Sequence, residues 1–122
     1  MIMMDGNTST PNSSLPPPPV PQRLREMLEA YPGHIDRLQE VLNNVVQDGR
    51  VLLMPFDQAI WALEGRLETF YREAQTELKT AQEEGEPGKI TRASEKVRLM
   101  SRASSKYTWI TDDALWRYFQ HK

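Results

Sequence analysis

The chain has 122 residues, a formal net charge of −2 and no cysteine. This length suits one folded domain, and the lack of cysteine excludes disulfides, thiolate metal sites and a cysteine nucleophile. The small net charge shows no bias towards nucleic acid, a membrane surface or an acidic substrate, and the longest apolar run, Val51 to Phe56, is far shorter than the ~20 residues that cross a bilayer.

The first 22 residues differ in composition from the rest of the chain. They contain six of the nine prolines and five Ser or Thr residues, and Asp5 is their only charged residue. Such a segment buries too little apolar surface to offset the entropy lost on folding, so we expect residues 1–22 to be a disordered tail.

A proline-rich run at 16–21 ends this predicted tail. It favours the stiff polyproline II conformation and, with Arg23, matches the P-x-x-P-x-R pattern that SH3 modules bind. We favour a stiff spacer as its role. The alternatives are a ligand for a proline-reading domain and, for the tail as a whole, the export signal of a leaderless secreted protein.

A stripe of apolar residues with helical spacing follows the tail, and Pro32-Gly33 interrupts it. Proline disfavours a helical conformation in the residue before it, so the pattern predicts two helices, at about 23–31 and 34–47. Because the stripe stays in phase across the break, we expect both helices to face the same partner. The next apolar segment, Val51 to Met54, lacks helical spacing and predicts a buried connector.

The dominant feature is a second stripe whose members alternate at steps of three and four: Phe56, Ile60, Leu63, Leu67, Phe70, Ala74, Leu78 and Ala81. This spacing is typical of a helix that packs on other helices, and it predicts one long helix over 55–84. Pro55 suits the first helical position, and the glycines at 85 and 88 end the helix. A further helix at 89–106 has the same spacing, with Tyr107 as the last member of its stripe. The short linker predicts that the two helices are antiparallel.

The two halves of this hairpin carry opposite charge. Residues 64–86 contain seven Glu against three basic residues, whereas residues 89–106 contain six Lys or Arg against one Glu. We expect mutual attraction to select the antiparallel pairing. The alternative is a basic face that binds nucleic acid or an acidic partner, formed by Lys89, Arg92, Lys96, Arg98, Arg102 and Lys106. Nucleic acid is not the expected partner, because overall basic charge and a known binding motif are both absent.

Half of the ten aromatic residues lie in the last sixteen positions, around a final helix predicted at 112–120. Aromatic side chains are common both in cores and at the centres of protein interfaces. One interpretation is that this helix closes the end of a bundle, and the other is that it forms a docking patch. The candidate partner-binding residues are Trp61, Trp109, Trp116 and Tyr118.

The pattern predicts no catalytic, metal-binding or cofactor-binding residue. His34 and His121 are the only histidines, and His34 with Asp36 lacks the i,i+4 spacing of metal ligands on a helix. A glycine-rich phosphate loop and a nucleophile elbow are also missing.

We therefore expect an all-α, mostly antiparallel helical bundle over residues 23–122, built around one long helix. The expected function is a non-enzymatic protein–protein interaction module: a small adaptor, regulator or chaperone-like protein in the cytoplasm. Its partner is another protein or a second copy of itself.

Overall fold

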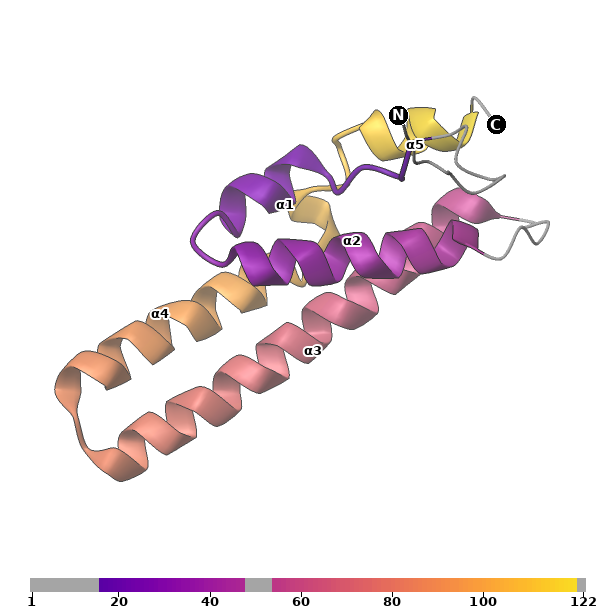
Figure 1. The fold of residues 1–122 in the computed structure, drawn as a ribbon. Coiled ribbons are helices and arrows are strands. Elements are labelled where there is room, and N and C mark those ends of the chain that lie inside the picture. Colours follow the sequence, from indigo (N-terminus) through magenta and orange to yellow (C-terminus); the bar gives the residue numbers. More distant parts are fainter. Residues whose placement is uncertain (1–15, 48–53, 121–122) are drawn as a thin grey trace, which may run out of the picture.

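The structure is a computed structural model that describes residues 16–47 and 54–120. In these ranges the chain is helical and contains no strand (Figure 1), with helices α1 (Gln22–Met27), α2 (Pro32–Gln47), α3 (Pro55–Glu84), α4 (Pro87–Ala103) and α5 (Ala114–Gln120), and a 3-10 helix, η2 (Lys106–Thr108). The predicted all-α architecture around one long helix is confirmed.

Helices α3 and α4 form the predicted hairpin. Pro55 occupies the first turn of α3, and Gly85 ends the helix in the left-handed conformation, with a φ of 74°. The Gly85 amide donates to the carbonyl of Ala81 at 3.0 Å, which closes the last turn. Because α4 begins only two residues later, at Pro87, it returns along α3 (Figure 1).

The break between α1 and α2 precedes Pro32, as the sequence predicts, but the first helix ends before the predicted residue 31. Helix α1 ends at Met27, residues 28–31 form a turn, and Pro32 is the first residue of α2. Proline has no amide hydrogen to lose at this position. Helix α2 packs mainly on α3 and α1 contacts α4, and buried leucines of both helices belong to one core cluster with residues of α3 and α4.

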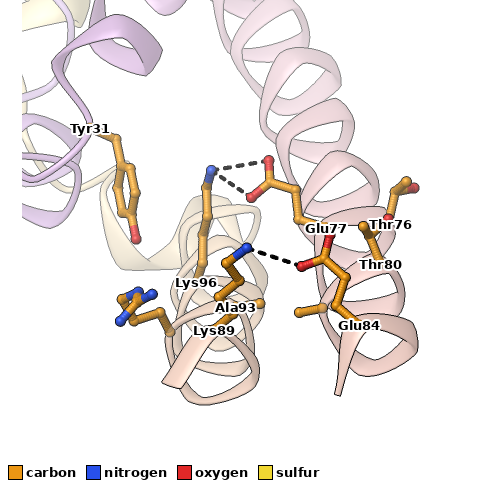
Figure 2. Close-up of a pocket in the computed structure, with 10 residues that line it drawn as sticks. Tyr31, Thr76, Glu77, Thr80, Glu84, Lys89, Ala93 and Lys96 are labelled. Atoms are coloured by element: carbon orange, nitrogen blue, oxygen red, sulfur yellow. Dashed lines mark hydrogen bonds and ion pairs between the residues drawn. The ribbon is translucent and has the colours of Figure 1, made fainter. Parts of the chain in front are cut away.

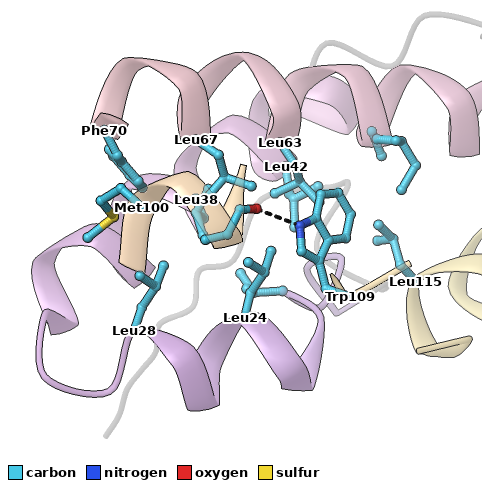
Figure 3. Close-up of a cluster of buried hydrophobic side chains, with 14 of the residues drawn as sticks. Leu24, Leu28, Leu38, Leu42, Leu63, Leu67, Phe70, Met100, Trp109 and Leu115 are labelled. Atoms are coloured by element: carbon cyan, nitrogen blue, oxygen red, sulfur yellow. Dashed lines mark hydrogen bonds between the residues drawn. The ribbon is translucent and has the colours of Figure 1, made fainter. Parts of the chain in front are cut away.

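The main core lies where α1, α2 and α3 meet the end of α4, the residue Trp109 that follows η2, and the first turn of α5 (Figure 3). Its largest completely buried side chain is Trp109, whose indole nitrogen donates to the Ala103 carbonyl oxygen at 2.8 Å. The other completely or almost completely buried side chains of this core include leucines, a phenylalanine and a methionine: Leu24, Leu28, Leu38, Leu42, Leu63, Leu67, Phe70, Met100 and Leu115.

A proline strap, residues 16–21, runs along the helices and belongs to the folded domain. Three of its side chains are buried: Pro18, Val20 and Pro21. The Gln39 side-chain amide donates to the Pro18 carbonyl at 2.7 Å, and the Tyr118 hydroxyl donates to the Pro16 carbonyl at 2.7 Å. The predicted tail therefore ends earlier than residue 22, because these backbone carbonyls and apolar rings find partners that sequence spacing does not show.

Residues 1–15 lie outside the described residues, and the predicted disorder there stays a prediction. The export-signal interpretation depends on the same residues. The SH3-ligand interpretation depends partly on the strap, and Pro18 and Pro21, the two prolines of its pattern, are both buried against the domain.

Candidate protein-binding surface

Large apolar side chains are exposed around the first two turns of α3. Trp116 of α5 is 48% exposed and Met54 is 49% exposed, although Met54 was expected in a buried connector. The rest of that connector, residues 51–53, lies outside the described residues. The Trp116 ring meets the Phe56 ring edge to face, with centroids 5.1 Å apart. A hollow of about 210 Å³ adjoins these groups, and Phe119 also lines it.

Trp61 lies in the second turn of α3, five residues after Phe56, and is 57% exposed. It borders an open groove of about 570 Å³ between α2 and α3. Val41 and Val45 of α2 line the groove together with Gln58 and Ala62 of α3. Trp61 lies off the core stripe of α3, and this periodicity is why the sequence could single it out.

The four predicted partner-binding residues divide into two pairs. Trp61 and Trp116 are exposed, whereas Trp109 is completely buried, so the core interpretation holds for Trp109. Tyr118 is half-buried and its hydroxyl is engaged with the strap, and burial raises the pKa of this phenol. Only the first pair is available to a partner in this structure.

Tyr107 is an exposed aromatic residue, whereas the sequence pattern predicts it on the packing face of a helix. It is 78% exposed, although helical spacing made it the last member of the α4 stripe. The reason is that α4 ends at Ala103 and a 3-10 helix follows, which changes the direction of the side chain.

Electrostatic pairing between α3 and α4, the favoured explanation of their opposite charges, is present in the structure. Lys89 Nζ lies 3.1 Å from a Glu84 carboxylate oxygen, and Lys96 Nζ lies 3.0 Å from Glu77 (Figure 2). Lys96 also lies 4.8 Å from the centre of the Tyr31 ring. The hydrogen bond to Glu84 raises the pKa of Lys89.

The remaining members of the predicted basic face behave differently. Arg92, Arg98 and Arg102 are exposed, and Lys106 lies 5.8 Å from the centre of the Tyr107 ring. A shallow groove of about 510 Å³ follows the hairpin, and both basic and acidic side chains line it, among them Lys89, Arg92, Glu77 and Glu84 (Figure 2). The sequence-predicted basic residues therefore do not form one surface of uniform charge.

A charged and aromatic junction joins α2 to the middle of the hairpin. Arg37 makes two hydrogen bonds of 2.9 Å to the Glu73 carboxylate, and the guanidinium carbon lies 4.7 Å from the centre of the Phe70 ring. These bonds lower the pKa of Glu73 and raise the pKa of Arg37. No local sequence pattern predicts this pair, because its two members are far apart in the chain.

His34 lies in the same junction, with its ring centre 4.2 Å from that of Phe70. Its Nε2 atom is buried and has no hydrogen-bond partner among the described residues. Burial lowers the pKa of His34, and the nearby charges of Lys96 and Arg37 lower it further, against a smaller opposing effect of Glu73 and Glu77. The lowered pKa favours the neutral imidazole, which packs against the Phe70 ring.

Within residues 16–47 and 54–120, no group of three or more His, Asp or Glu residues is placed to hold a metal ion. No helix in the same ranges is long and apolar enough to cross a membrane. Comparison of the chain with protein-family models, with curated proteins and with solved structures gives no match. The surface itself is therefore the basis for a functional proposal.

Proposed function

We propose that the protein is a non-enzymatic interaction module that binds another protein through the exposed tryptophans near the start of α3. The observation that carries this proposal is the exposure of Trp61 and Trp116, each beside a hollow that neighbouring apolar side chains line. An exposed indole costs free energy in water, and tryptophan is among the residues that contribute most to protein interfaces.

The proposal covers an adaptor, a regulator or a chaperone-like protein in the cytoplasm. All three act by binding alone, and they need a folded platform with a few large apolar anchors. The buried core around Trp109 supplies the rigid platform, because it fixes α3 and α5 relative to each other.

Affinity capture with matched variants tests the proposal. The full chain is used as bait beside Trp61→Ser, Trp116→Ser and a control, Tyr107→Ser, which removes an even more exposed aromatic group outside the two hollows. We expect a partner that the wild type and the control retain and that one or both tryptophan variants lose. Binding should then be reproduced with the purified partner. Capture that none of these substitutions changes would contradict the proposal.

Binding of nucleic acid or an acidic partner through α4 is the second candidate, and the exposure of Arg92, Arg98 and Arg102 favours it. It has less support, because Lys89 and Lys96 are already paired with glutamates of α3. Phosphate contacts lose affinity steeply with ionic strength. A titration of DNA and RNA at several salt concentrations would detect this dependence, and a lack of salt-sensitive binding would remove the candidate.

A further inference from the structure

The outer face of α3 contains a glycine that no contact with residues 16–47 or 54–120 explains. Gly65 lies in the interior of the helix and is exposed, and a Cβ atom added there would meet no described atom within 4 Å. Glycine in a helix interior is less favourable than alanine by ~1 kcal/mol. The position therefore lowers helix stability without relieving any crowding inside the molecule.

Other residues of this face are compatible with its burial against a partner. Trp61 lies one turn before Gly65, on the same side of the helix and away from the core stripe. The hydroxyl of Thr69 donates to the Gly65 carbonyl at 3.1 Å, and that of Thr76 donates to the Arg72 carbonyl at 3.2 Å. Because these hydroxyls are satisfied by their own helix, covering the face leaves neither without a hydrogen bond.

We propose that this face binds the same face of a second copy of the chain, so that two α3 helices cross antiparallel at Gly65. The inference rests on the proposed interaction function and names its partner. A residue without a side chain at the crossing lets the two backbones approach closely, and each Trp61 then covers the Gly65 and Thr69 surface of the other copy. Such a two-fold contact uses one patch twice, as in most homodimers.

Charge identifies a second copy as the occupant. Asp57 lies eight residues before Gly65 and Arg72 lies seven residues after it, and both are exposed. Within one copy they are about 22 Å apart along the helix and cannot pair. In the antiparallel arrangement they lie on the same side of the contact, where Arg72 of one copy reaches Asp57 and Trp61 of the other. The pairing occurs twice in each dimer.

The same geometry indicates a reversible dimer of modest affinity. Arg72 has a loose contact of 3.8 Å with Glu68 of its own helix, which competes with the contact to Asp57. Glu64 lies beside the crossing, so the Glu64 side chains of the two copies face each other across the two-fold axis and repel. We therefore expect the dimer to form as the protein concentration rises rather than to be permanent.

Sedimentation equilibrium of the full chain from low to high micromolar concentration tests the pairing. We expect a monomer–dimer equilibrium that Asp57→Arg or Arg72→Asp alone weakens about tenfold, because each change breaks two exposed ion pairs and creates like-charge contacts. The double variant should recover most of the loss. Arg98→Asp changes an exposed arginine on α4; it is the matched control and should leave the equilibrium unchanged.

Gly65→Gln gives an independent readout with two opposite effects. Glutamine favours the helix, so the unfolding temperature of the dilute monomer should rise. Its side chain blocks the close crossing, so the dimer should weaken. A merely destabilising substitution would not separate these effects, and the thermal measurement shows at the same time that the variant is folded.

A protein that remains monomeric over the whole range overturns the pairing, and so does a double charge variant no stronger than the single ones. These results are distinguishable from failure of the proposed function. A monomer whose Trp61→Ser variant loses a different captured protein would keep the interaction module and remove only the second copy.

Discussion

The two ends of the α3–α4 hairpin have the same sequence pattern but very different surroundings. At the broad end, α1, α2, α5 and the proline strap cover the hairpin, and side chains such as Leu63, Leu67 and Phe70 are completely buried. The hairpin tip, residues 82–89, extends beyond these elements, and there α3 and α4 lie side by side (Figure 1). Every residue from 82 to 89 is exposed.

The difference shows that a continuous apolar stripe does not bury its members equally. Towards the tip the stripe contains Ala74, Leu78 and Ala81, and Leu78 is only half-buried. Two helices alone cannot surround a side chain, whereas three or more can. An alanine has little apolar surface to leave exposed there, and its small side chain lets the two helices approach. The glutamate–lysine pairs at the edges favour the antiparallel pairing of α3 with α4.

The largest expected effect is at the broad end. Trp109→Ala removes a completely buried indole and leaves the Ala103 carbonyl without its donor, which should lower the free energy of unfolding by about 3–5 kcal/mol. Urea unfolding followed by circular dichroism measures the loss. A loss no larger than that of a substitution at the hairpin tip would contradict the division into a supported end and an unsupported one.

The strap should contribute an intermediate amount. Val20→Ala removes two buried methyl groups and should lower the free energy of unfolding by about 1–2 kcal/mol. Pro17 lies in the same strap but is exposed, so Pro17→Ala is the matched control and should have little effect. Equal effects of the two substitutions would show that the strap does not pack on the domain in solution.

A smaller effect is expected where the hairpin leaves the bundle. Lys96→Met keeps the aliphatic part of the side chain but removes the ion pair with Glu77 and the contact with the Tyr31 ring. We expect a loss of about 1 kcal/mol, because the lysine is mostly buried while its glutamate is half-exposed. Lys79→Met is the control, since Lys79 is exposed on α3. Local amide exchange should increase near residue 96 in the first variant only.

The smallest expected effect is the pH dependence of the junction at His34. The pKa of His34 is lowered in the folded state from its ordinary value of 6.5, so the stability that the neutral imidazole contributes is complete above that value and is lost as the pH falls below it. Replacement by a neutral group, His34→Gln, should reduce the slope of stability against pH between about pH 7 and 5. The lowered pKa of Glu73 acts in the same direction at lower pH, and it should remain visible in the variant. An unchanged slope would show that His34 titrates as an ordinary exposed histidine.

Much of the fold could be predicted from local patterns. The long helix follows from the spacing of Phe56 to Ala81 and from Pro55 and Gly85, signals that act within a few residues. The strap could not be predicted in this way, because Gln39 and Tyr118 recognise backbone carbonyls that are distant in sequence. Composition alone assigns such a proline-rich run to a tail.

The candidate surface was predictable only in part. Trp61 could be singled out because it departs from the core period of α3, and it is exposed. The burial of Trp109 depends on where α4 ends, and the exposure of Tyr107 depends on the 3-10 turn that follows. Helical periodicity carries no information once the helix has stopped.

Site-specific photo-crosslinking tests most directly whether binding occurs at the broad end. A benzophenone amino acid replaces Trp61 in one variant and Gln82, an exposed residue of the hairpin tip, in another. We predict a discrete adduct from position 61, with a mass of twice the chain for a second copy or a different mass for another protein, and no adduct from position 82. An adduct from the tip with none from position 61 would contradict the account.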